Sequence, residues 1–335
     1  MTNLISNISN KKSTVFGLGL AFFVILPFFG GSYYSHIFII VLLNVCLASG
    51  YRLLYITGLG SFCHVTFYGI GAYTSAILSL TFHLPYGLCL IASGLAAGIV
   101  SVAFTWPSVR AKGVYFFVIS FAFWVVMNSV FKHWKSLTNG SAGIRSIPPI
   151  LGFTGVIPYY YMALLLCLFT VAVMYRIDKS RFGQELKAIG EDDVLASSTG
   201  INIVFHRVLA HAIGAFSAGL AGSLFAHYVR YISPKSFSLW FTIYILFWCV
   251  LGGEKKFWGP IAGAVLLTLI AELLRMTGVL QAIFYAVAVL VVVMTMPHGI
   301  VGLVEDYRSK FGHRSGPLNV PQKFPFGNNR QDIKQ

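Results

Sequence analysis

The chain has 335 residues, of which 57% are hydrophobic and only 10% are charged. Soluble domains carry about 25% charged residues, and no soluble core of this size hides so much apolar surface. The composition therefore excludes a soluble fold and predicts an integral membrane protein whose solvent is mostly lipid.

The net charge of +14 raises nucleic-acid binding as one interpretation. We reject it, because the basic residues lie in short turns between apolar stretches, where Lys and Arg set the orientation of membrane helices. The five cysteines lie within apolar stretches and form no CxxC pair, so neither a disulfide framework nor a zinc site is expected. Lys11 and Lys12 precede an apolar run as in a signal peptide, but no small-residue cleavage site follows, so we interpret this run as a retained helix.

A helix that crosses a bilayer needs about 20 mostly apolar residues. This rule predicts ten spans, which in chain order are 14–31, 34–50, 62–84, 86–106, 113–131, 157–175, 207–230, 238–252, 257–275 and 277–296. The predicted fold class is therefore all-α, a polytopic bundle of about ten transmembrane helices. The span at 34–50 is short, and the break before the last span is tight.

The distribution of Lys and Arg predicts the orientation. With ten crossings and the N-terminus inside, 18 of the 24 Lys and Arg residues fall on one side, which marks that side as cytoplasmic. The chain then divides into a cytoplasmic N-terminus at 1–13, a transmembrane domain at 14–304 and a basic cytoplasmic tail at 305–335, expected to be poorly ordered. Two connections are long: an outer loop at 132–156 and a more polar inner loop at 176–206.

The inner loop holds four apolar residues at near-helical intervals among charges: Leu186, Ile189, Val194 and Leu195. This spacing predicts short amphipathic helices that lie outside the membrane. The acidic run at 191–193 is suited to cap the second of them, and Gly200 is suited to end it. The loop is then either a solvated connection or a docking helix that inserts into a groove of a cytoplasmic partner.

Several motifs, in the same order, resemble one known family. They lie at 64–74, 112–116, 183–202, 215–224, 227–234 and 250–264, and the similarity extends over 36–304. The inner-loop motif is the most informative: Gly183, then Leu-Lys-Ala-Ile at 186–189, an acidic patch, and Gly-Ile-Asn at 200–202. On these residues the chain resembles the branched-chain amino acid permeases of ATP-binding cassette importers, the LivM-type subunit of the LivH/LivM family.

The sequence departs from the family pattern in three places. It has Thr-Asn-Gly at 138–140, Ser-Phe-Cys-His at 61–64 and the charged run Glu-Lys-Lys-Phe at 254–257. Because of these departures, the motifs do not identify the exact substrate.

The resemblance implies a multi-pass permease subunit of the bacterial inner membrane for branched-chain or other hydrophobic amino acids. It also implies a second related permease, two cytoplasmic ATPases that use ATP, and a periplasmic substrate-binding protein that docks at 135–149. This chain itself would bind no cofactor and no nucleic acid. Related permeases carry urea or other small amides, which is the alternative within the same class.

The resemblance assigns candidate residues to two sites. Those of the ATPase-coupling loop are Gly183, Leu186, Ala188, Ile189, Glu191, Asp192, Ala196 and Gly200. Those expected to line the pathway are Gly58, Ser61, His64, Gly69, Gly71, Tyr73, Tyr115 and Asn128. For His64, a hydrogen-bonded structural role is the competing interpretation.

Glycine has two interpretations in membrane helices. It permits close helix packing, and the small residues Ala215, Ala218, Gly219 and Gly222 form such a face on the seventh predicted span. It also permits unwound segments that line a path, which we expect at 58–61 and 69–71.

The sequence contains no GxxxxGK[ST] phosphate loop, nucleophile elbow or HExxH motif, so no ATPase or other enzyme activity is expected of this chain. Glu272 is the only acid within an apolar run, and its position one turn from Arg275 predicts an ion pair at the outer end of a span. Scarce intramembrane carboxylates disfavour a rival hypothesis, an autonomous secondary transporter or channel. A third, a membrane-embedded enzyme, needs a His, Asp or Glu cluster at one interface, which the sequence lacks.

Overall fold

The computed structural model of the chain describes residues 31–111, 113–253, 256–275, 286–287 and 290. Within them the chain is mostly helical, as the predicted all-α class requires. The predicted spans at 14–31 and 277–296 lie almost wholly outside the described residues. The predicted terminal segments at 1–13 and 305–335 lie wholly outside them.

The longer helices of the described part are α2 (Gly31–Tyr55), α3 (His64–Thr81), α4 (Tyr86–Ser108), α5 (Val114–His133), α7 (Val156–Lys179), α8 (Arg181–Glu191), α10 (Ile203–Val229), α11 (Leu239–Gly252) and α12 (Trp258–Leu274). The shorter elements are α6 (Lys135–Thr138), η1 (Gly140–Ala142), β1 (Ile144–Arg145), η2 (Ile150–Gly152), α9 (Asp193–Ser198), β2 (Tyr231–Ile232) and η3 (Pro234–Phe237).

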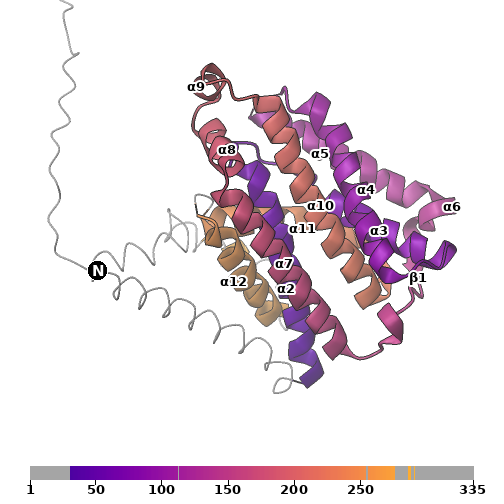
Figure 1. Ribbon diagram of the computed structural model, residues 1–335. Helices are drawn as coiled ribbons and strands as arrows, with labels where there is room; N and C mark the ends of the chain where they lie inside the picture. Colours follow the sequence, from indigo (N-terminus) through magenta and orange to yellow (C-terminus); the bar gives the residue numbers. More distant parts are fainter. Residues whose placement is uncertain (1–30, 112, 254–255, 276–285, 288–289, 291–335) are drawn as a thin grey trace, which may run out of the picture.

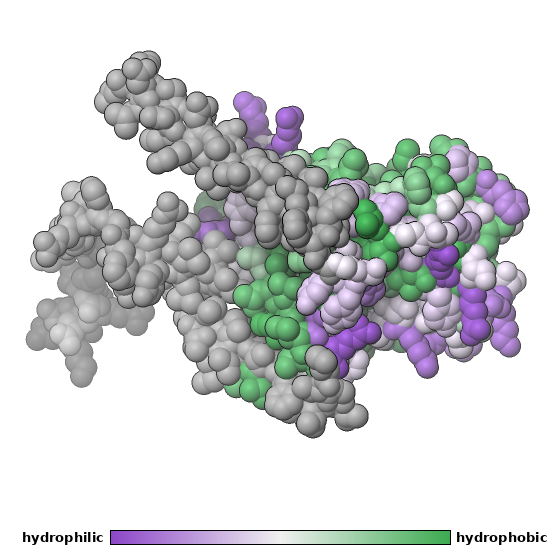
Figure 2. All heavy atoms as spheres, turned by 90° about the horizontal axis from the view of Figure 1, so that it is seen from below, coloured by the Kyte–Doolittle hydropathy of each residue, from purple (hydrophilic) through white to green (hydrophobic). Residues whose placement is uncertain are grey.

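Six segments of the described part are long and apolar enough to cross a bilayer: Gly31–Tyr55, Tyr86–Ser108, Val114–His133, Val156–Lys179, Ile203–Val229 and Pro234–Gly252. Apolar side chains cover large parts of the surface in Figure 2, and Tyr115 and Trp240 are 77% and 70% exposed. Lipid or another apolar chain must cover such a surface, because exposing so large an apolar area to water is energetically unfavourable. The chain is therefore a multi-pass membrane protein, while ten crossings and cytoplasmic termini stay predictions.

The helix α2 lies in the middle of the bundle. It packs against α7, α10 and α12, and most of its residues are buried. A helix that is apolar all round needs partners on every side, and α2 meets this condition. The predicted span at 34–50 was too short: the helix runs five residues further, because Tyr51 and Arg52 are themselves buried.

The helix α10 divides the bundle, with α2, α7 and α12 on one side and α3, α4 and α5 on the other (Figure 1). The small residues of α10 allow its backbone to approach the backbones of α2 and α3 closely. A Cβ at Gly222 would overlap the backbone carbonyl of Tyr68 in α3, and a Cβ at Gly214 would lie 2.5 Å from the carbonyl oxygen of Gly50 in α2. The predicted small-residue face therefore packs backbone against backbone.

The predicted unwinding at 69–71 is wrong, because both glycines lie inside the continuous helix α3. Gly71 faces Gly219 of α10 so closely that no Cβ fits between them. A Cβ at Gly69 would lie 3.1 Å from the rings of Phe131 and Phe237. These glycines therefore allow close packing, and the helix needs no break.

The two long loops lie at opposite ends of α10. The helices α8 and α9 precede its first residue, and this end is called the α9 end below (Figure 1). At the other end, β2 follows α10 and pairs antiparallel with β1 of the loop 132–156, with Ile144 opposite Ile232. The sequence did not predict these strands. The expected ion pair is confirmed at the end of α12, where Nη1 of Arg275 lies 3.1 Å from Oε1 of Glu272.

Candidate functional site

The helix α8 is an amphipathic helix held against the bundle. Its first turn is capped by Ser180, whose Oγ accepts a hydrogen bond of 3.3 Å from the backbone N–H of Gly183. Leu186 and Ile189 are fully buried, and Leu186 packs in a cluster with Leu53 of α2. A Cβ at Gly183 would overlap the carbonyl of the last turn of α7, so glycine is required here. The predicted amphipathic helix is confirmed.

The helix α9 is short and projects from the bundle. Asp192 is its N-cap, because Oδ1 accepts hydrogen bonds from the backbone N–H groups of Val194 (2.8 Å) and Leu195 (3.0 Å). Gly200 follows the helix with φ +86°, a conformation that glycine adopts freely. The predicted cap and stop are both confirmed.

The two apolar side chains of α9 differ from those of α8. Val194 and Leu195 are 72% and 64% exposed, and only Ala196 of this helix is buried. The sequence spacing placed them on the same kind of face as Leu186 and Ile189. The structure instead turns them outward, because α9 projects beyond the end of the bundle (Figure 1).

A buried ion pair joins three helices at the α9 end. Nη1 of Arg52, in the last turn of α2, lies 2.7 Å from Oδ1 of Asp178 near the end of α7. Nζ of Lys187 on α8 lies 3.1 Å from the other carboxylate oxygen. The side chains of Arg52 and Asp178 are only 2% and 4% exposed, so water screens their attraction weakly. This group holds α8 to the ends of α2 and α7.

A second ion pair joins α9 to α10. The guanidinium of Arg207 binds both carboxylate oxygens of Asp193, at 3.2 Å from Nη1 and 2.7 Å from Nη2. The same Nη2 donates a hydrogen bond of 2.9 Å to the carbonyl oxygen of Thr57. The side chain of Arg207 is 5% exposed, and a buried guanidinium needs such partners. Glu185 of α8 forms a further pair with His206, at 2.8 Å.

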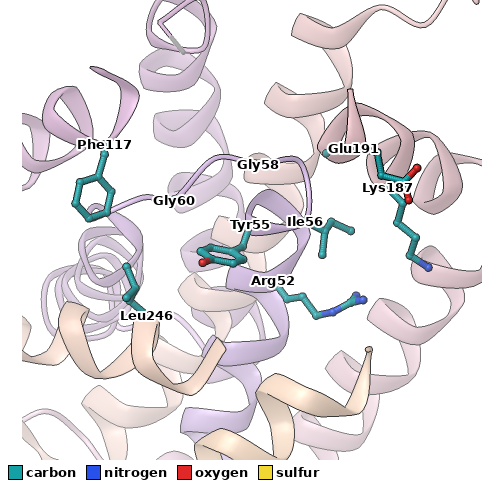
Figure 3. A pocket seen from close by; sticks show the side chains of 10 residues that line it. Arg52, Tyr55, Ile56, Gly58, Gly60, Phe117, Lys187, Glu191 and Leu246 are labelled. Atoms are coloured by element: carbon teal, nitrogen blue, oxygen red, sulfur yellow. The ribbon is translucent and has the colours of Figure 1, made fainter. Parts of the chain in front are cut away.

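A cavity of about 640 Å³ opens beside these groups. Its lining comes from the end of α2, the turn that follows it, α5, α8 and α11, as Figure 3 shows. The lining residues are Arg52, Tyr55, Ile56, Gly58, Gly60, Phe117, Lys187, Gly190, Glu191 and Leu246. The cavity therefore brings Gly58 of the predicted pathway and Glu191 of the predicted coupling loop to one space.

The chain between α2 and α3 is not helical, so the predicted unwinding at 58–61 is confirmed. Side chains satisfy its backbone: the N–H of Ser61 donates to the Tyr51 hydroxyl (3.2 Å), and the N–H of Phe62 donates to Oγ of Ser120 (2.9 Å). Non-helical backbone is stable at membrane depth only when such partners exist.

The other predicted pathway residues do not line this cavity. Ser61 and His64 are buried beside it, and the ring of His64 meets that of Tyr51 edge to face at 5.4 Å. Three others lie nearer the end of the bundle that carries the β1–β2 pair. There Gly69 and Tyr73 contact Phe131, and Asn128 donates a hydrogen bond to η3. Tyr115 lies on the exposed face of α5. Their role in a pathway stays a prediction, and so does the coupling role of Ala188 beside the buried face of α8.

The sequence did not point to Arg52, Asp178 or Arg207 as parts of the site, and it assigned Asp193 only to the acidic run at 191–193 that caps α9. The pairing of these charges depends on the tertiary structure, because it joins residues up to 126 positions apart. One signal was available for Asp178, since an acid directly after an apolar span needs either water or a cationic partner.

Comparisons with known proteins match the chain to one family of transport proteins. The family "Branched-chain amino acid transport system / permease component" matches residues 33–296. The chain is 27% identical to the high-affinity branched-chain amino acid transport system permease protein LivM of Salmonella typhimurium, over 84% of this chain and 71% of that protein. It is 30% identical to LivM of Escherichia coli, over 71% of this chain and 61% of that protein.

The second permease of the same transport system is also similar. The chain is 27% identical to LivH of Escherichia coli, over 77% of this chain and 91% of that protein. No solved structure matches the chain. Since the family match covers most of the sequence, the chain belongs to the family of permease components of branched-chain amino acid transport systems.

Proposed function

We propose that this chain is the permease subunit of an ATP-binding cassette importer in the bacterial inner membrane. It carries branched-chain or other hydrophobic amino acids and forms one half of the translocation pathway. A second related permease supplies the other half. Family membership supports this proposal, as does similarity to both LivM and LivH, the two permease proteins of such a transport system.

The observation that carries the proposal is the outward apolar pair on α9. Val194 and Leu195 project from a helix with a capped, acidic start, at the α9 end of the bundle. An exposed apolar pair on a short helix fits a groove on a partner protein. The partner is a cytoplasmic ATPase, because transport needs an energy source and this sequence has no phosphate-binding loop.

The end of the bundle that carries the β1–β2 pair, opposite the α9 end, is the proposed docking surface for a periplasmic binding protein. The loop 132–156 is held there by the β1–β2 pair and by a hydrogen bond of 2.9 Å between Nδ1 of His227 and the carbonyl oxygen of Pro148. A surface that is ordered before binding pays less entropy when the partner docks.

The test is transport by the complete system in proteoliposomes. The chain is reconstituted with its second permease, its ATPases and its binding protein, and uptake of radiolabelled leucine is measured with and without ATP. We expect ATP-dependent uptake that also needs the binding protein. Uptake by this chain alone without ATP would instead favour a secondary transporter or channel.

The double variant Val194→Asp, Leu195→Asp is expected to lose the ATPase. Burial of a Val or Leu side chain contributes about 1.5–3 kcal/mol, so two such losses weaken association by about 100-fold or more. Co-purification of the ATPase with the permease complex measures the effect.

The matched control is Ser197→Asp, which adds a negative charge to the same helix at an exposed polar position. It is expected to keep ATPase binding. Equal ATPase recovery from the double variant and the control would show that the apolar pair is not the contact.

A further inference from the structure

The turn 56–60, which follows α2, is attached to both helices of the α9 end. On one side, Arg207 holds Asp193 at the start of α9 and the carbonyl of Thr57 in the turn with the same guanidinium. A single buried side chain therefore connects α9 to the turn. Because the Asp193 pair is bidentate, it fixes the direction of the guanidinium as well as its position.

The second attachment is a backbone contact. Gly190, in the last turn of α8, lies so close to the turn that a Cβ there would overlap the carbonyl of Ile56. Side chains are absent from this contact, so a movement of the end of α8 reaches the turn directly. Contacts between close-packed groups transmit displacement because such packing does not deform continuously.

The glycines of the turn border the cavity. Gly58 is exposed with φ +78°, and both Gly58 and Gly60 border the 640 Å³ cavity. Figure 3 shows the turn with its two glycines between Phe117 of α5 and the end of α8. The turn is thus attached to α8 and α9, while its glycines border the cavity and Gly60 lies against the ring of Phe117.

The ion pair of Arg52 and Asp178 has a different geometry. It joins the ends of α2 and α7, and Lys187 adds the body of α8. The partners of the Asp178 carboxylate are the guanidinium of Arg52 and the ammonium of Lys187. This group holds α8 against the bundle. The contacts with the turn come instead from Gly190, at the end of α8, and from Arg207, which also binds Asp193 at the start of α9.

We propose that the turn 56–60 is the gate at the α9 end of the pathway, and that Arg207 is the positioning residue that moves it when α9 is displaced. The inference rests on the proposed function, in which an ATPase displaces α9. When α9 moves, Arg207 moves the carbonyl of Thr57, and the glycines at 58 and 60 let the turn enter or leave the cavity. The gate is then driven by one hydrogen-bonded attachment, through Arg207, and one backbone contact, at Gly190.

The test compares transport with ATP hydrolysis in the reconstituted complete transporter. Arg207→Met removes every donor while keeping an apolar stem in the buried position. Asp193→Ala removes the α9 side of the connection and leaves the bond to Thr57. Both are expected to assemble with the ATPase and hydrolyse ATP, while leucine carried per ATP falls about tenfold or more, as expected when charged hydrogen bonds are lost.

The matched control is Glu185→Gln, which removes the neighbouring ion pair with His206 but touches no part of the turn. It is expected to keep the wild-type ratio of leucine to ATP. An unchanged ratio in Arg207→Met or Asp193→Ala overturns the inference, because a merely structural residue lowers the yield of complex and leaves that ratio intact.

Two features keep the outcome decisive. If Arg207→Met does not assemble, Asp193→Ala decides, because Arg207 keeps its hydrogen bond to the carbonyl oxygen of Thr57 and water can enter the 20% exposed site that the carboxylate leaves. If wild-type protein shows no ATP-dependent uptake, the proposed function fails as well. That result differs from normal wild-type uptake with an unchanged ratio in the variants, which overturns the gate alone.

Discussion

Replacing Asp178 by alanine is expected to lower the free energy of unfolding of this chain by about 3–5 kcal/mol. The guanidinium of Arg52 is 2% exposed, and it would lose the carboxylate that lies 2.7 Å away. Lys187 of α8 would lose the same carboxylate as its partner. Thermal unfolding of the purified protein in detergent measures the effect, and a loss of this size also lowers the yield of folded protein.

The matched control is Glu272→Ala, which breaks an ion pair of similar length at the end of α12. Arg275 is 61% exposed there, so the control should cost no more than about 1 kcal/mol. Equal unfolding temperatures for Asp178→Ala and the control would contradict the prediction. The double variant Arg52→Met, Asp178→Leu should recover most of the loss, because neither charge then stays buried alone.

The helices themselves were largely predictable from the sequence. Eight of the ten predicted spans coincide with helices of the described part, because each apolar stretch must form internal backbone hydrogen bonds in lipid. The error at α2 has a tertiary cause. A charge after an apolar stretch predicts the end of a span, but Arg52 continues the helix because Asp178 meets it from α7.

The sequence did not distinguish glycines in an unwound segment from glycines at a helix crossing. The segments 58–61 and 69–71 are both rich in glycine, and only the first is unwound. The difference lies in the opposite helix: Gly71 faces Gly219 at a helix crossing, whereas Gly58 faces a cavity. Such partners are set by tertiary packing, which local spacing does not encode.

The coupling loop was predictable in its local features and not in its contacts. The cap at Asp192 and the stop at Gly200 depend on residues within a few positions of each other. The connection from Asp193 through Arg207 to Thr57 spans 150 residues and depends on how α2 and α10 cross. The outward direction of Val194 likewise depends on where the bundle ends.

Replacing Gly222 by leucine is expected to prevent normal packing of α10 against α3. Even the first carbon of a side chain there would overlap the carbonyl of Tyr68 and lie 3.0 Å from the backbone N of Ala72. The neighbouring atoms belong to a helix backbone and have no rotamer to change. The two helices must therefore separate, with an expected loss of about 3 kcal/mol or more in the free energy of unfolding.

The matched control is Gly87→Leu, in the first turn of α4, where a Cβ meets nothing within 4 Å. That variant should be neutral or slightly stabilising, because glycine is a poorer helix former than leucine by roughly 0.5–1 kcal/mol. A wild-type unfolding temperature for Gly222→Leu would mean that α3 and α10 do not approach this closely. Such a result would also weaken the gate, because α3 begins only four residues after Gly60 and the crossing with α10 fixes the helix that the turn leads into.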